Sequence, residues 1–174
     1  MSGHGLARSA RMALVLVTIL VVQVAVVADL RAFGALGDLM LLLAIAAGSV
    51  GGPNRGAVYG FSAGLAYDLM LDTPFGLSPL VYALVGFGVG VVGLWFVEPR
   101  WWVSVGVAAM ASALAVGLMV AVAAVVDLRY PFEDVARIAG VVAAWNAVLI
   151  LPARRLLRWV VGEEEPDQFR VALP

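Results

Sequence analysis

The sequence predicts an all-α protein that is embedded in a membrane as a bundle of six transmembrane helices. Of its 174 residues, 63% are hydrophobic and only 13% are charged, and the mean hydropathy is +1.01. A soluble domain is about half apolar and about a quarter charged, and a core of this size could not bury so much apolar surface. The lipid bilayer must therefore take the place of water around much of the chain.

Charged residues divide the sequence into apolar stretches. A helix needs about 20 residues, within a range of roughly 17–25, to cross a bilayer. Six stretches come close enough to this length to be spans, at about residues 12–28, 39–54, 57–71, 77–97, 101–126 and 138–153. The second, third and sixth are short. Five spans are the alternative, in which residues 39–71 are partly re-entrant. In either case residues 1–161 are expected to form a single transmembrane domain.

The first and fourth stretches carry signals at their starts. The first follows Arg8 and Arg11 as a signal peptide would, but it is too long and no small-x-small cleavage site follows it. It is therefore interpreted as an uncleaved helix. In the fourth stretch, Ser78 is predicted to be the N-cap residue of the helix and Pro79 its first residue.

The arginines predict how the bundle is oriented, because cytoplasmic loops of membrane proteins carry an excess of basic residues. With six spans and the N-terminus inside, the inner segments hold eight arginines and the outer loops hold three, Arg31, Arg129 and Arg137. Five spans would move Arg154 to the outside, which this bias opposes. Both termini are therefore expected in the cytoplasm. The acidic, proline-containing tail at residues 162–174 is expected to be disordered.

The third stretch contains a row of small and acidic residues at four-residue spacing, Gly56, Gly60, Gly64, Asp68 and Asp72. Positions four apart lie on neighbouring faces of a helix, so the glycines form a bare strip. In lipid, helices associate largely through close backbone approach at such small-xxx-small strips. The strip, with Phe61 beside it, is predicted to pack against a partner helix, with Gly86 and Gly90 as its neighbour inside the bundle. Packing only within the bundle is the alternative.

Three polar residues, Gln23, Asp68 and Asn146, lie within the predicted spans. A charge at the bilayer centre costs roughly 2.5–3.5 kcal/mol on insertion scales, so such a residue usually faces protein or water. For Asp68 we expect a specific partner, either an arginine or backbone amides at an outer helix end, and interfacial water is the alternative. Gln23 and Asn146 are expected to form interhelical hydrogen bonds, which contribute about 0.6 kcal/mol on average.

No pattern in the sequence indicates an enzyme, a cofactor, a metal site or a nucleic-acid-binding surface. There is no cysteine, the single histidine is His4, and no His/Cys/carboxylate spacing typical of metal ligands occurs. Glycines at residues 86–93 have a dinucleotide-like spacing, but they lie in an apolar helix and not after a strand. The net charge is −1 and there is no basic block. A non-catalytic protein without cofactor or metal is therefore expected.

Between Gln23 and Gly90 the sequence resembles the bacterial rod shape-determining protein MreD family. The resemblance rests on a glutamine in the first span, an aspartate that opens the second, a glycine-rich third span with an aspartate, and a Gly-Leu pair that leads a fourth span containing tyrosine and glycines. These positions are Gln23, Asp38, Gly56, Gly60, Phe61, Gly64, Leu65, Asp68, Gly76, Leu77, Tyr82, Gly86 and Gly90. The matching region covers about 70 of the 174 residues.

The resemblance implies a non-catalytic scaffold of the cell-wall elongation machinery in the bacterial cytoplasmic membrane. It implies a general fold similar to the substrate-binding subunits of energy-coupling-factor vitamin transporters. The implied partners are the single-span MreC and, through the complex, RodA and a class B penicillin-binding protein. The alternative function is a substrate-binding subunit of a small-molecule transporter. Its polar pocket would be built from outer-loop residues Asp29, Arg31, Asp127, Arg129 and Tyr130.

Overall fold

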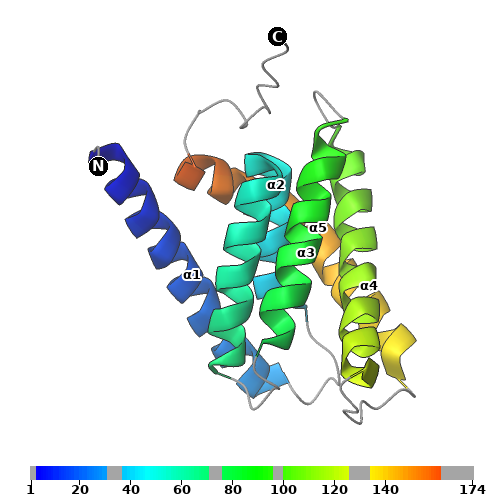
Figure 1. The fold of residues 1–174 in the computed structure, drawn as a ribbon. Helices are drawn as coiled ribbons and strands as arrows, with labels where there is room; N and C mark the ends of the chain where they lie inside the picture. The colour runs from blue at the N-terminus through cyan, green and yellow to red at the C-terminus, as the bar shows by residue number, and fades with distance from the viewer. Residues whose placement is uncertain (1–2, 31–36, 71–75, 96–99, 126–133, 162–174) are drawn as a thin grey trace.

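The computed structural model describes residues 3–30, 37–70, 76–95, 100–125 and 134–161, and these residues form helices and short turns without any strand (Figure 1). The predicted all-α class is confirmed for this part of the chain. The helices are α1 (Gly3–Leu30), α2 (Leu39–Asp68), α3 (Leu77–Gly93), α4 (Trp101–Val125) and α5 (Val135–Val161). The tail at residues 162–174 lies outside the described residues.

Helix α2 consists of two helical segments that meet at Gly52. This residue has φ +80° and ψ −177°, a backbone conformation that residues other than glycine rarely adopt. Pro53 follows it and lacks the N–H that would continue the helical hydrogen bonds. Beyond Gly52 the chain reverses. A Cβ atom built on Gly56 would lie 2.8 Å from the Cα of Gly48, although eight residues of straight helix span about 12 Å. We refer to residues 39–51 as the first arm and residues 53–68 as the second arm; Figure 1 shows them as a hairpin.

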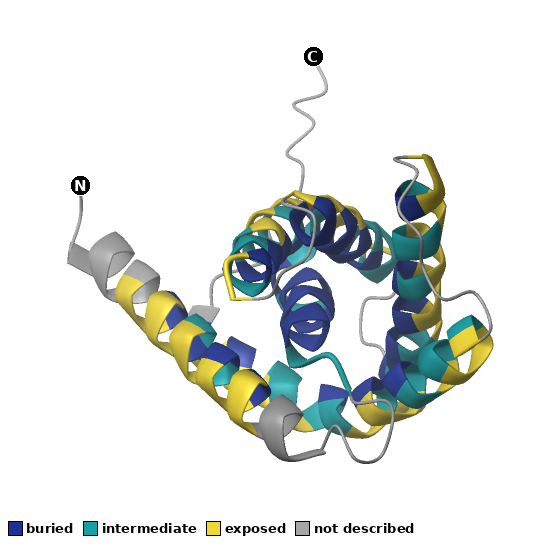
Figure 2. Ribbon diagram, turned by 90° about the horizontal axis from the view of Figure 1, so that it is seen from below, coloured by how far each residue is buried: buried dark blue, intermediate teal, exposed yellow. Residues whose placement is uncertain are grey.

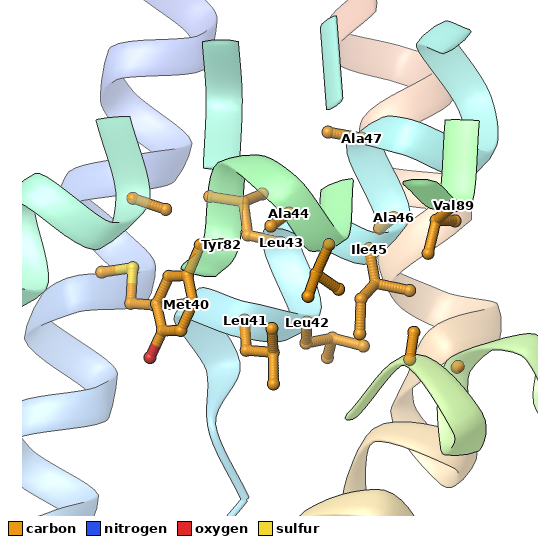
Figure 3. Close-up of a cluster of buried hydrophobic side chains, with 14 of the residues drawn as sticks. Met40, Leu41, Leu42, Leu43, Ala44, Ile45, Ala46, Ala47, Tyr82 and Val89 are labelled. Atoms are coloured by element: carbon orange, nitrogen blue, oxygen red, sulfur yellow. The ribbon is translucent and has the colours of Figure 1, made fainter. Parts of the chain in front are cut away.

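The first arm lies at the centre of the molecule. All residues from 40 to 47 are buried, and Figure 2 shows a fully buried helix with the other helices around it. Every side chain in this run is apolar, which is typical of a helix that is enclosed on all sides. Tyr82 and Val89 of α3 pack against the arm (Figure 3). The first arm is thus the core around which the bundle is built.

The surrounding helices present apolar side chains outward. Within the described part of the chain, two helices are long and apolar enough to cross a membrane, Trp101–Val125 and Val135–Val160, and residues 10–25 and α3 form shorter apolar helices. Large apolar residues on the outer faces are exposed, for example Leu14 on α1, Met110 on α4 and Val148 on α5. Helix α1 lies at the edge of the bundle, where it contacts α2 and α5.

The predicted N-cap of α3 at Ser78 is wrong. The helix begins at Leu77 and its N-cap residue is Gly76, which has φ +102° and no side-chain capping bond. A positive φ is required where the chain turns into this helix, and glycine adopts it without strain. Ser78 is therefore the second residue of the helix, where its hydroxyl is buried and has no hydrogen-bond partner among the described residues.

Candidate functional site

Glycines bring α2 and α3 into backbone contact along what we call the glycine seam, formed by Gly48, Gly56, Gly60, Gly64, Gly86 and Gly90. A Cβ atom built on Gly56 would overlap the carbonyl oxygen of Gly86, and one built on Gly60 would overlap that of Tyr82. A Cβ atom on Gly64 would overlap the backbone of Pro79. As the residue number rises along the second arm it falls along α3, so these two helices are antiparallel and touch at each turn.

Gly86 is the point where three helical segments meet. A Cβ atom built there would overlap the carbonyl oxygen of Gly56 on the second arm and would lie 3.2 Å from that of Ala44 on the first arm. A Cβ atom built on Gly48 in the first arm would overlap the carbonyl oxygen of Gly86, which also faces Gly56. The strip predicted from the sequence does not include Gly48, although Gly48 continues the four-residue spacing backward from Gly56 through Gly52. This continued spacing is the feature of the sequence that could have identified Gly48.

The structure therefore places the predicted strip against helices of the same chain. Gly56, Gly60 and Gly64 are buried in the seam, as are Gly86 and Gly90 on the facing helix. Phe61 lies outside the seam, and its side chain is 52% exposed. Among the residues predicted to form the packing surface, Phe61 is the one that no described part of the chain covers.

The N-terminus of the first arm begins inside the bundle, and side chains satisfy its backbone N–H groups. The Asp38 Oδ1 accepts hydrogen bonds from the N–H groups of Met40 (3.1 Å) and Leu41 (2.9 Å). The Gln23 Oε1 on α1 accepts one from the N–H of Leu39 (2.9 Å). The first N–H groups of a helix have no partner within the helix, and lipid cannot supply one. Gln23 and Asp38 thus allow a helix to start in a buried position.

Tyr82 connects this cap to α3. Its hydroxyl donates a hydrogen bond to the Asp38 Oδ2, so that the carboxylate is held from both sides. The Tyr82 ring is buried and lies 6.1 Å from that of Tyr67 on the second arm, with an interplanar angle of 48°. Because Gln23 and Tyr82 belong to different helices, this network joins α1, α2 and α3 at one place.

Asp68 joins the end of α2 to the start of α3. It is buried, and its Oδ2 accepts a hydrogen bond from the backbone N–H of Gly76 at 2.8 Å. A backbone amide at a helix end is one of the two kinds of partner that the sequence led us to expect. The bond fixes the turn between the two helices at the end of the glycine seam.

A second polar contact joins α4 and α5. The Asn146 Nδ2 donates to the Ser112 Oγ at 2.9 Å, and Arg154 donates from its guanidinium to the Ser104 Oγ. Ser104 and Ser112 are eight residues apart, as are Asn146 and Arg154, so the two helices pack antiparallel in one register. Asn146 thus makes the interhelical hydrogen bond that was expected of it.

The polar side chains of the described residues do not gather into a metal-binding group. No group of three or more His, Cys, Asp and Glu side chains that could hold a metal ion occurs among the residues described. The carboxylates of Asp38 and Asp68 accept hydrogen bonds at helix starts. The outer-loop residues from which a transporter pocket would be built lie outside the residues whose side chains the structure describes. The polar contacts described above connect helix starts and neighbouring helices.

Comparison with known proteins identifies the family. A family model described as rod shape-determining protein MreD matches residues 7–160, which is most of the chain. No curated protein and no solved structure matches the sequence. The resemblance drawn from the sequence is confirmed, and most of the residues that carry it lie in the glycine seam, in the cap of the first arm and at the turn held by Asp68. The chain therefore belongs to the MreD family of rod shape-determining proteins.

Proposed function

We propose that this chain is a non-catalytic scaffold of the cell-wall elongation machinery. In this role it docks a single-span MreC-like protein and, through it, RodA and a class B penicillin-binding protein. Membership in the MreD family gives the chain a part in rod shape determination. The observation that carries the scaffold proposal is that the hydrogen bonds of Gln23, Asp38 and Asp68 all stabilise helix starts.

The proposal includes six helical segments in the bacterial cytoplasmic membrane, with both termini in the cytoplasm. The two arms of α2 count separately because the chain reverses at Gly52. Arg11 near the start of α1 stacks on Trp159 near the end of α5, 5.8 Å from the ring centroid, so these helix ends lie on one side. The first arm has 13 residues and is about 20 Å long, shorter than the bilayer core of about 30 Å. A general fold like that of the transporter subunits named above is part of the same proposal.

The docking surface in this proposal is one side of the seam, formed by Phe61, Leu80 and Phe87. Phe61 follows Gly60 and Phe87 follows Gly86, whereas Leu80 follows Pro79, whose backbone meets Gly64. In an antiparallel helix pair, positions that follow a contact residue by one point to the same side of the contact. These side chains are 52%, 48% and 45% exposed, respectively. Because the seam glycines hold the two helices in close contact, the positions of the three side chains are fixed relative to one another. A partner helix would meet a preorganised apolar ridge, which lowers the cost of binding.

The test is recovery of the partner with a variant that alters only this ridge. In cells that carry the complete machinery, F61A/F87A should reduce co-purification of the MreC-like protein about tenfold, the effect of losing about 1.4 kcal/mol. The matched control is V58A/L84A, which truncates two exposed apolar residues on the faces of the same helices that are directed away from the contact between them. Equal recovery with both double variants would contradict the proposed surface.

A further inference from the structure

Positive charges gather at the end of the bundle where α2 reverses. Arg11, Arg100, Arg154, Arg155 and Arg158 all belong to helix ends on this side. The three carboxylates whose side chains the structure describes are Asp38, Asp68 and Asp134, and they belong to the opposite half of the bundle. Within the described residues, no acidic side chain balances the arginines of this end, which we call the basic end.

Arg154 on α5 is held against α4 by a hydrogen bond. Its guanidinium donates a hydrogen bond to the Ser104 Oγ, and its Nε is buried without a partner among the described residues. A guanidinium has five N–H donors, so this single bond leaves most of its donor capacity for another acceptor. Arg158 follows one helical turn later and is exposed, so the two side chains are neighbours on the surface of α5.

Exposed tryptophans mark the depth of this site. Trp101, Trp102 and Trp159 are all more than half exposed, and such rings settle at the headgroup level of a membrane. Ser104 lies three residues beyond Trp101, about 5 Å deeper along the helix. The Arg11 guanidinium lies over the Trp159 ring, which brings a further positive charge to this end of α5. Arg154 and Arg158 therefore lie at the depth where lipid phosphates are found.

We propose that Arg154 and Arg158 bind the phosphate of an anionic glycerophospholipid on the basic side of the membrane. Phosphate accepts charge-assisted, bidentate hydrogen bonds from guanidinium groups, and basic pockets between membrane helices bind lipid headgroups. Ser104 positions the Arg154 guanidinium for this contact. The ligand reaches Arg154 from the bilayer, because the outer faces of α4 and α5 are apolar and exposed. The bound phosphate balances two like charges one turn apart.

The experiment measures thermal unfolding of the purified full-length chain in an uncharged detergent with added phosphatidylglycerol or phosphatidylcholine. Phosphatidylglycerol at about ten times its Kd should raise the Tm of the unsubstituted chain by about 3–5 °C, and phosphatidylcholine should not. R154Q and R158Q should each lose at least half of this shift. Because R154Q removes a buried contact, the exposed Arg158 provides the variant that leaves the fold intact. R137Q, at the other end of α5, is the matched control and should keep the full shift.

Three results would overturn the proposal. One is a phosphatidylglycerol shift that R154Q and R158Q leave unchanged. Another is a shift with a polyprenyl phosphate and none with phosphatidylglycerol, which would assign the site to a different lipid. The third is no phosphatidylglycerol shift together with a lower Tm for E163Q/E164Q/E165Q, which would mean that the chain's own acidic residues balance the arginines.

Discussion

Individual side chains in this protein act mainly by satisfying backbone groups where helices begin. Asp38 accepts hydrogen bonds from two N–H groups of the first arm and from the hydroxyl of Tyr82. Asp68 accepts one from the N–H of Gly76. A buried backbone donor without a partner costs about 1–3 kcal/mol, and this cost cannot be relieved by water inside a membrane. Carboxylates, which destabilise a helix when they face lipid, therefore stabilise the helix starts of this protein.

Replacing Asp38 tests this role. D38A leaves the N–H groups of Met40 and Leu41 without an acceptor and should lower the free energy of unfolding by about 2–3 kcal/mol. D38N should cost less, because an asparagine oxygen caps a helix nearly as well as a carboxylate. Unfolding in mixed micelles would measure both. S62A is the control, since the Ser62 hydroxyl donates to Val58 O within an exposed turn and its loss should change little. If D38N cost as much as D38A, charge and not capping would be the role of Asp38.

Some of these residues could be predicted from the sequence. Gln23 and Asn146 were identified because a polar side chain inside a span needs a partner, and both make the expected kind of bond. Asp38 entered only through the family resemblance, since an aspartate beside an apolar stretch looks like an ordinary loop residue. Ser78 was wrongly taken as a cap, because its Ser-Pro signal is a local one and the turn at Gly76 depends on a positive φ and on the distant Asp68.

At the scale of helices, the glycine seam determines how α2 and α3 pack. Small-xxx-small spacing predicts close approach of two helices but does not say whether the second helix belongs to the same chain. In this protein both arms of α2 and α3 supply the contact, and any added Cβ atom meets backbone that cannot move aside. The reversal at Gly52 is what turns a row of glycines in sequence into a three-segment junction.

Leucine substitutions distinguish seam glycines from other glycines. G60L/G64L should prevent the second arm from approaching α3, so that folded monomer is lost and not merely complex formation. G106L/G117L is the matched control, because a Cβ atom at either position meets nothing within 4 Å and both residues are exposed. Size-exclusion chromatography in mild detergent, with inserted protein quantified in membranes, would compare them. Recovery of a folded G60L/G64L monomer would show that the seam is not required inside the bundle.

At the scale of the whole molecule, composition was enough to predict an all-α membrane protein, and the spacing of charges was enough to locate most helices. Neither the composition nor the spacing of charges shows which helix is central. The first arm and α4 are both apolar on all sides, yet residues 40–47 are enclosed and α4 has an exposed face. Lipid is as apolar as a protein core, so hydrophobicity does not separate a face that meets lipid from one that meets another helix.

The central claim is that this bundle is a scaffold whose outer ridge receives a partner helix, and crosslinking in native membranes tests it most directly. After mild-detergent purification, mass spectrometry would identify the crosslinked proteins and the positions joined. The account predicts a single-span MreC-like protein together with wall-synthesis enzymes, with crosslinks on the side of α2 and α3 that carries Phe61 and Phe87. Recovery of an ATPase pair and a bound small molecule would contradict it and would identify the chain as a transporter subunit.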